Sequence, residues 1–334
     1  MSVAVDVGTR AGPDVMTQMR RWSQRNSWTL ALLGLFAATL LVTFLIQPSY
    51  GAAQIQGLAI GALPLAMAAV AQAIVVISGG IDLSVGSMMA LTSVISAVLM
   101  KDQPEAFAIA VVIGVLVLGL ILGIINGVLV VITRVPDIVV TLAMSFVWAG
   151  AALVVLHTPG GGSAEWIRDI AKGSIGSEWI PSALVTLLII VGVIWIPLRR
   201  STAGVALYAV GSHRLAAFRS GVPVSRTKVF AYMLGGLFSA FGGLALTATT
   251  GIGTPVPGAY TLLGVAAIVL GGVSLAGGRG GIAGPIVAVF VLALVRTDLT
   301  LLGVNSNLST VIQGAILIGV VMFGSLLTMR RART

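Results

Sequence analysis

Residues 77–88 read ISGGIDLSVGSM, and they place an aspartate, Asp82, inside a long apolar stretch. The 334-residue chain is 57% hydrophobic and only 9% charged, whereas a soluble domain carries about 25% charged residues. This composition predicts a polytopic membrane protein. A carboxylate in the bilayer core costs about 3 kcal/mol or more, so Asp82 needs a structural or functional reason.

The apolar stretches predict the number of membrane spans. A spanning helix needs about 20 mostly apolar residues. Ten stretches qualify: 28–47, 58–78, 83–100, 106–132, 138–156, 182–198, 229–250, 259–276, 282–302 and 309–328. The expected fold is an all-α membrane bundle of about ten helices. A transmembrane domain over 28–328 would be flanked by cytoplasmic tails at 1–27 and 329–334.

The basic residues predict the orientation, because cytoplasmic loops are rich in lysine and arginine. With both termini in the cytoplasm, Lys101, Arg168 and Lys172 lie outside and Arg296 lies within a span. The inside then holds Arg10, Arg20, Arg21, Arg25, Arg134, Arg199, Arg200, Arg214, Arg219, Arg226, Lys228, Arg279, Arg330, Arg331 and Arg333. This bias accounts for the net charge of +9 without a nucleic-acid partner.

Several kinds of chemistry have no residues to support them. The chain has no cysteine, no GxxxxGK[ST] phosphate-binding loop and no HExxH, and its histidines, His157 and His213, lie in predicted loops. We therefore expect no enzyme activity, no cofactor and no metal site in this chain. Proton-coupled carriers usually need acids or histidines within the membrane. Only Asp82 and Asp298 are acids near predicted spans.

Two loops are long enough to have a role of their own. In the outer loop, 157–182, Trp166, Ile167 and Ile170 form an apolar stripe that predicts a helix lying on the membrane surface. The inner loop, 199–228, is basic and contains no acid. Its size predicts a role beyond connecting two spans.

The sequence also contains a weak internal repeat. AIVVISGGIDLSVG (73–86) and AAIVLGGVSLAGG (266–278) both run from apolar residues through a glycine pair to a leucine. Transporters are often built from repeats with broken helices near the substrate path. Chance similarity between sequences rich in glycine and alanine is the alternative.

Several segments of the sequence resemble a known family. GGIDLSVGSMMAL (79–91) resembles the signature of the inner-membrane permeases of ribose-type ATP-binding-cassette importers. The likeness covers nearly the whole chain after about residue 28. NGVLV (126–130) with Pro136 and Thr141-Leu142, GSHRLAAFRSGVPV (211–224) and AAIVLGGVSLAGGRG (266–280) support it.

The resemblance implies a function and a set of partners. The chain would form the path for a monosaccharide or related small polar solute across the bacterial cytoplasmic (inner) membrane. It would work with ATPase subunits, a second permease subunit, identical or homologous, and an extracytoplasmic sugar-binding protein. An ion- or proton-coupled carrier and a non-transporting scaffold subunit are the alternatives.

The resemblance also assigns the inner loop to coupling. A short helix over 213–220 would sit in a cleft of the ATPase, with Phe218 as its knob and Gly221 ending it. The implied coupling residues are Gly211, His213, Arg214, Leu215, Ala216, Ala217, Phe218 and Gly221. A basic surface helix that meets anionic lipid is the alternative.

Some positions depart from the family. His213, Arg214 and Leu215 stand where an asparagine and often an acid occur in the family. Asp137 stands where an aromatic residue is common. Ala149 replaces a frequent arginine, and Thr261 and Leu263 replace acids. These departures are expected of a heterodimeric permease or of an unusual solute.

Asp82 has two possible roles. Gly79, Gly80, Asp82, Ser84 and Gly86 would form a broken-helix junction in which Asp82 caps the following helix by accepting the amide of Ser84 or Val85. Alternatively, Asp82 and Ser84 line the pathway and bind sugar hydroxyls.

Other polar residues inside predicted spans are candidates for the pathway. These are Gln72, Ser78, Asn126, Thr141 and Trp148. The alternative for each is a hydrogen bond between helices, which is common in membrane bundles.

Overall fold

The computed structural model describes residues 27–256, 258–305, 307–309, 311–312, 314–315, 318–319 and 322. The described chain is mostly helical, as predicted. Its helices are α2 (Ser27–Ile46), α3 (Ala52–Ile77), α4 (Val85–Met100), α5 (Phe107–Thr133), α6 (Asp137–Val155), α7 (Glu165–Lys172), α8 (Ser182–Arg200), α9 (Thr202–Ser212), α10 (Arg214–Arg219), α11 (Val224–Thr250), α12 (Tyr260–Leu270) and α13 (Ala283–Leu301). A hairpin of β1 (Ser174–Ile175) and β2 (Ser177–Pro181) was not predicted.

Seven helices are long and apolar enough to cross a membrane: α2, α3, α5, α6, α8, α11 and α13. A helix satisfies its own backbone hydrogen bonds, which lipid cannot do. The chain is therefore a multi-pass membrane protein. The predicted span at 309–328 and both tails lie largely outside the described residues. The count of ten spans and the cytoplasmic position of both termini stay predictions.

Two predicted spans are shorter than the sequence suggested. Helix α4 has 16 residues, because it begins at Val85 and not at Leu83. Helix α12 has 11 residues, although apolar residues continue beyond it. Helix α12 stops at Leu270 because a glycine pair follows, and Gly272 adopts a positive φ of 81°. The expected span at 259–276 is wrong in its last turns, since hydropathy alone does not register a helix end inside apolar sequence.

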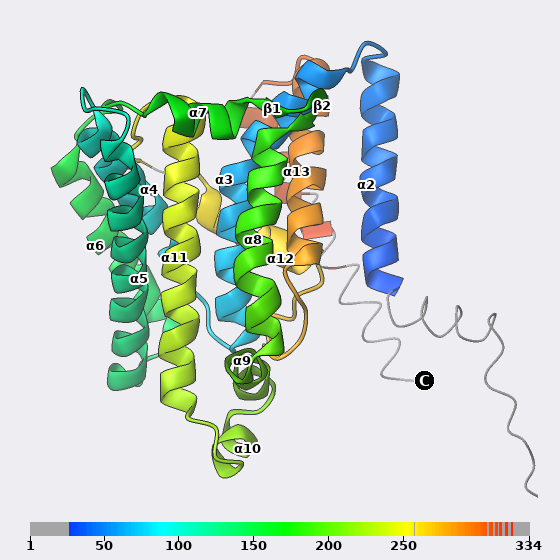
Figure 1. The fold of residues 1–334 in the computed structure, drawn as a ribbon. Coiled ribbons are helices and arrows are strands. Elements are labelled where there is room, and N and C mark those ends of the chain that lie inside the picture. The colour runs from blue at the N-terminus through cyan, green and yellow to red at the C-terminus, as the bar shows by residue number, and fades with distance from the viewer. Residues whose placement is uncertain are drawn as a thin grey trace, which may run out of the picture.

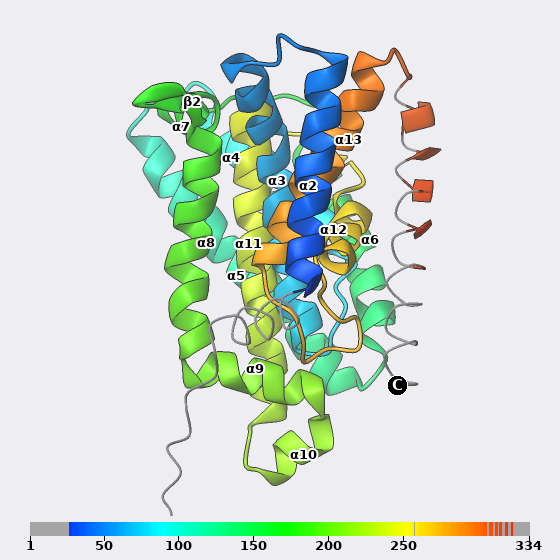
Figure 2. The same cartoon turned by 90° about the vertical axis from the view of Figure 1, so that its right-hand side faces the viewer.

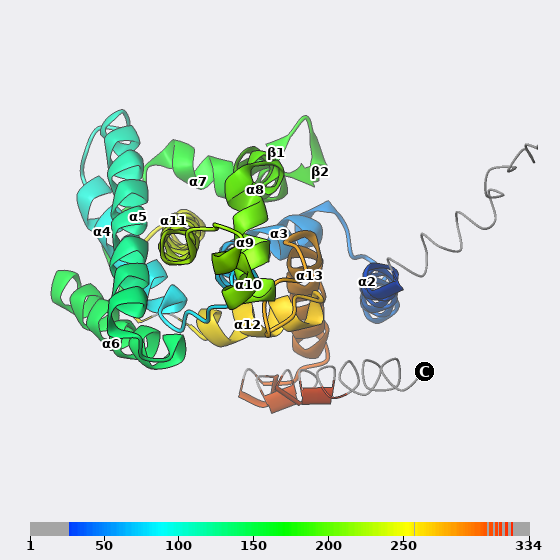
Figure 3. The same ribbon diagram turned by 90° about the horizontal axis from the view of Figure 1, so that it is seen from below.

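The helices form a bundle with two different ends (Figure 1). Helix α7 and the hairpin cover one end, which we call the α7 end. Helices α9 and α10 lie at the opposite end, the α10 end. Helix α9 runs across the bundle axis, and α10 lies beyond it (Figure 2). Viewed from the α10 end, α9 and α10 cover the middle of the bundle (Figure 3).

Helix α11 organises the core by packing against α3, α4 and α5. Its contact with α5 is backbone to backbone. A methyl group on Gly236 of α11 would overlap the carbonyl oxygen of Gly119 on α5, and it would lie 2.8 Å from the amide nitrogen of Gly123. Small residues allow this close approach, which favours van der Waals packing between membrane helices.

Helix α7 in the loop 157–182 packs against the bundle, and its position on the membrane surface stays a prediction. Helix α7 forms where the apolar stripe was seen, and it packs on α8 and α11. Ile167 and Ala171 are buried in the core, and Trp166 donates from Nε1 to the carbonyl oxygen of Glu105 (3.2 Å). Ile170 remains exposed. Helix α7 therefore contacts the rest of the protein through Trp166 and Ile167, two of the three residues of its predicted stripe.

Candidate functional site

Residues 78–84, which belong to the stretch ISGGIDLSVGSM, connect α3 to α4, and we call them the junction. Asp82 is fully buried there, and its Oδ1 accepts the amide of Ser84 (2.8 Å) and the hydroxyl of Ser84 (2.6 Å). Gln72 on α3 donates from Nε2 to the Asp82 carbonyl oxygen (2.6 Å). The hydrogen bond expected between Asp82 and the Ser84 amide is therefore present. The expectation that Asp82 caps the helix is wrong, because α4 begins at Val85, its N-cap residue is Ser84 and no side chain caps it. The Asp82–Ser84 bond closes a turn just before the helix.

Side chains from α5 and α6 close around the junction. Asn126 donates from Nδ2 to the Ser84 hydroxyl (2.6 Å), and Trp148 donates from Nε1 to Asn126 Oδ1 (3.3 Å). Thr141 Oγ1 accepts the amide of Leu83 (3.1 Å) and donates its proton to the Asp137 carbonyl oxygen one turn back (2.9 Å). Four of the five pathway candidates therefore meet at the junction. The fifth, Ser78, bonds within its own helix end, to the Val75 carbonyl oxygen (2.7 Å).

Helix α12 also holds the junction, through a residue noted as a departure from the family. The hydroxyl of Thr261 accepts the amide of Gly86 (2.9 Å). Gly86 lies in the first turn of α4, where backbone amides have no partner within the helix. The Thr261 hydroxyl thus satisfies one of these amides from a helix 175 residues away in the chain.

A second departure, Asp137, forms an ion pair that sequence reasoning missed. Lys228 Nζ on α11 lies 2.8 and 2.7 Å from the two carboxylate oxygens of Asp137 at the start of α6. The Tyr232 hydroxyl, one turn along α11, lies 2.9 Å from Asp137 Oδ2 and 3.2 Å from the Ile81 carbonyl oxygen. The only signal in the sequence was an acid at 137 and a base at 228, and nothing linked them.

The two copies of the internal repeat end their helices in the same way. At the end of α3 the amides of Gly79 and Gly80 donate to the carbonyls of Val76 and Val75 (2.9 and 3.0 Å). At the end of α12 the amides of Gly272 and Val273 donate to Val269 and Ile268 (3.0 and 2.9 Å). Both ends are Schellman motifs.

The implied coupling helix forms as α10. His213 accepts the Ala216 amide through Nδ1 (3.2 Å), which caps its first turn. Gly221, at φ 82°, ends it. Leu215 and Phe218 are exposed, Phe218 by 67%. Arg214 and Ala216 are also exposed.

One coupling residue lies differently from the expectation. Ala217 is buried with Val210 and Val224, the latter at the start of α11. It therefore anchors α10 to its own chain and is not part of the exposed surface. Ala216 and Phe218 remain available to a partner.

Gly211, near the end of α9, joins α10 to both broken helices. A methyl group on Gly211 would overlap the carbonyl oxygen of Ile77 at the end of α3, and it would lie 2.6 Å from the Gly278 amide nitrogen. That amide donates to the same Ile77 oxygen (2.9 Å). A methyl group on Gly79 would lie 3.4 Å from the Gly211 Cα. We call Gly79, Gly211, Gly277 and Gly278 the glycine contact.

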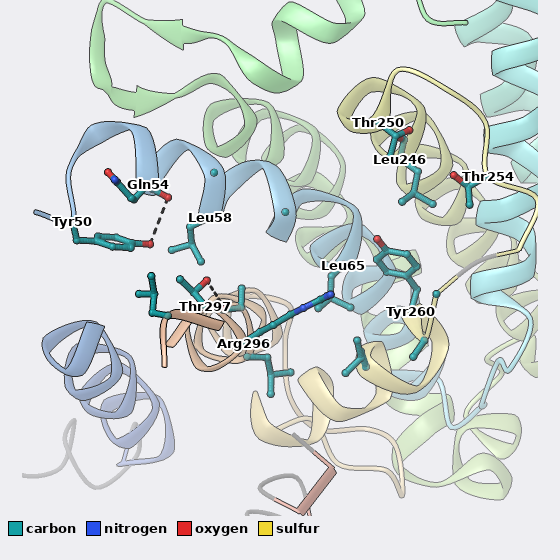
Figure 4. A pocket seen from close by; sticks show the side chains of 18 of the residues that line it. Tyr50, Gln54, Leu58, Leu65, Leu246, Thr250, Thr254, Tyr260, Arg296 and Thr297 are labelled. Atoms are coloured by element: carbon teal, nitrogen blue, oxygen red, sulfur yellow. Dashed lines mark hydrogen bonds between the residues drawn. The ribbon is translucent and has the colours of Figure 1, made fainter. Parts of the chain in front are cut away.

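A cavity of about 710 Å³ lies between α3, α11, α12 and α13. None of the pathway candidates lines it. Tyr260 and Arg296 do, and Arg296 extends into it from α13 (Figure 4). The sequence places Arg296 within a predicted span and assigns it no role. The feature that could have pointed to a binding site is a single basic residue within an apolar stretch.

No group of three or more potential metal-ligating side chains occurs among the described residues.

Comparison with known proteins gives the family. Residues 54–321 match the protein family described as "Branched-chain amino acid transport system / permease component". The chain is 36% identical over 248 residues to the ribose import permease protein RbsC of Bacillus subtilis, covering 73% of this chain and 76% of that one. It is 31% identical over 315 residues to the autoinducer 2 import system permease protein LsrD of Escherichia coli, covering 89% of this chain and 92% of that one.

No solved structure matches the chain. The family match and the two relatives confirm the resemblance that rested on residues 79–91. The chain therefore belongs to the family of membrane permease components of transport systems.

Proposed function

We propose that this chain is the membrane subunit of an ATP-binding-cassette importer for a monosaccharide or a related small polar solute. Relatives named for ribose import and for autoinducer 2 import support the solute class. ATP hydrolysis would take place in partner ATPase subunits, and an extracytoplasmic sugar-binding protein would deliver the solute. A second permease subunit, identical or homologous, would complete the pathway in the bacterial cytoplasmic membrane.

The observation that carries this proposal is the exposed α10 and its connection to the junction. Phe218 stands out from a short capped helix at one end of the bundle. On its N-terminal side α10 follows Gly211 of α9, and on its C-terminal side it is followed by α11. The glycine contact meets the end of α3, and Lys228 and Tyr232 on α11 reach Asp137 and Ile81.

These two routes suggest how force on α10 would reach the membrane path. Packed cores transmit displacement, because they have few voids and low compressibility. A pull on α10 would move Gly211 against Ile77 and would move the first turns of α11 against the junction. Both routes act on residues 78–84, where α3 is interrupted. Asp82, Ser84, Asn126 and Thr141 would keep the junction in shape while it moves.

The test is reconstitution of this chain in lipid with the ATPase and binding protein encoded beside it. We expect the sugar-loaded binding protein to stimulate ATP hydrolysis and ATP-dependent sugar uptake. Ala216→Glu and Phe218→Ala should abolish the stimulation without loss of the folded chain. Val193→Ala, which shortens an exposed apolar side chain on α8, is the control. Wild-type stimulation in the α10 variants would disprove the coupling role of α10.

A further inference from the structure

We propose that the cavity between α3, α11, α12 and α13 is a binding site for a small hydroxylated solute that carries an oxyanion, a carboxylate or a phosphate. Arg296 is the residue that recognises the charge. This inference rests on the proposed importer function, because it names the class of solute that the importer would carry.

The cavity has the size and walls of a small-molecule site. Its volume of about 710 Å³ lies within the range of roughly 300–1,000 Å³ typical of ligand sites. Leu65, Leu263 and Leu292 contribute apolar walls. Apolar walls exclude water, so polar interactions inside the cavity are stronger than at an open surface.

The charge of the lining is positive. Arg296 lines the cavity and no acidic residue does. Asp298, two residues along α13, lines a separate cavity with Ala38 and Val42 of α2. Among the described residues the ion pair found is Asp137–Lys228, so Arg296 has no carboxylate partner within that part of the chain.

Most other polar side chains of the lining already have partners. Thr250 and Thr297 donate to the carbonyl oxygens of Leu246 and Ala293 (2.7 and 3.0 Å). Gln54 accepts the amide of Gly51 through its side-chain oxygen (2.9 Å). Arg296 is the only charged side chain among the described residues of the lining, so recognition of an oxyanion falls to it, and Tyr260 lines the same cavity. Figure 4 shows Arg296 reaching from α13 toward the side of the cavity where Tyr260 lies.

The chemistry of these two groups defines the ligand class. A guanidinium is always charged and presents its donors in a planar fork that fits a carboxylate or phosphate. An unpaired guanidinium within a membrane span is costly, and a bound oxyanion offsets this cost. A cationic solute would be repelled. A neutral sugar would leave the charge uncompensated.

The oxyanion could belong to a solute or to a lipid headgroup, and the test separates the two. The full chain is placed in nanodiscs of phosphatidylcholine alone. Its thermal unfolding is measured with D-gluconate, D-ribose 5-phosphate or D-ribose at equal ionic strength, because a ligand that binds the folded state raises the unfolding temperature. We expect both anions to stabilise the chain and ribose to have much less effect.

Variants identify the site. Arg296→Gln should weaken binding of the anions by roughly tenfold or more, and Arg296→Lys should retain part of it. Arg279→Gln, in the loop after α12, is the matched control and should bind as wild type. Equal stabilisation by ribose and the anions, or unchanged binding in Arg296→Gln, would overturn the proposal.

A second set of nanodiscs contains phosphatidylglycerol. If that lipid stabilises the wild type through Arg296 and the soluble anions neither stabilise it nor compete, the site belongs to a lipid and the solute assignment is wrong. These measurements need neither ATPase nor binding protein. Failure of ATP-dependent uptake would therefore count against the proposed function, and failure of anion binding against this site alone.

Discussion

Gly211 touches the carbonyl oxygen of Ile77 so closely that a single methyl group would overlap it. This contact joins the end of α9 to the end of α3, 134 residues earlier in the chain. It places backbone against backbone, and a flexible side chain could not absorb a change there. The position can therefore be tested with the smallest possible substitution.

We expect Gly211→Ala to separate α9 from the junction. The methyl group must displace Ile77 or Gly278, and overpacking of this kind costs about 1–3 kcal/mol. The thermal unfolding temperature should fall, and ATPase stimulation by the binding protein should be lost. Gly192→Ala is the control, because its methyl group would lie 3.9 Å from the end of the Ile196 side chain and meet no backbone. Equal behaviour of the two variants would contradict the contact.

Removal of one partner from the Asp137–Lys228 pair should destabilise the chain more than removal of both. Both side chains are largely buried, 16% and 8% exposed. A stranded buried charge costs about 3–5 kcal/mol. We expect Asp137→Asn and Lys228→Met each to lower stability strongly, and the double variant to lower it by less than their sum.

A double-mutant cycle by chemical unfolding in nanodiscs measures this coupling. Tyr232→Phe should cost less, about 1 kcal/mol, because it removes only a hydroxyl. Strictly additive losses from Asp137→Asn and Lys228→Met would show that the pair is not coupled.

Asp82→Asn and Asp82→Ala should differ. The Ser84 amide and hydroxyl both donate to one oxygen, Asp82 Oδ1. An asparagine oxygen can accept both, whereas alanine leaves both donors buried without a partner, at about 1–3 kcal/mol. We expect Asp82→Asn to remain folded and Asp82→Ala to unfold at a lower temperature. If both variants lose uptake while both stay as stable as wild type, the carboxylate acts on the solute and its structural role at the junction is wrong.

Thr261 should matter through its hydroxyl. Thr261→Val keeps the shape of the side chain but strands the Gly86 amide, at a cost of about 1 kcal/mol or more. Thr261→Ser should restore most of the stability. The same thermal assay compares the three chains, and a valine variant as stable as the serine variant would exclude this hydrogen bond as a source of stability.

The sequence was sufficient to predict the elements whose signal is local. Hydropathy predicts the long helices α5 and α11. The polar Asn126 and the following Gly127 lie within α5 and do not interrupt its apolar sequence. The pair Gly79-Gly80 followed by Asp82 and Ser84 predicts an interrupted helix, and the observed hydrogen bonds match it. His213 and Gly221 lie at the two ends of α10, near the expected bounds of 213–220.

What the sequence did not reveal depends on contacts between distant segments. Lys228 was counted as one of many basic residues, and its partner Asp137 lies 91 residues away. Arg296 and Tyr260 share a cavity only because α12 and α13 pack against α3. Ala217 was assigned to the coupling surface but is buried with Val210 and Val224, and a six-residue helix has too few turns for its sequence to define a buried side.

The position of α11 in the chain has a consequence for biosynthesis. This helix supplies the packing surface for α3, α4 and α5, yet the ribosome makes it after all three. During translation the short α4 and the buried Asp82 must remain in the membrane before their main neighbour exists. We expect nascent chains that stop before residue 224 to be substrates for membrane proteases, and chains that extend past residue 250 to escape them.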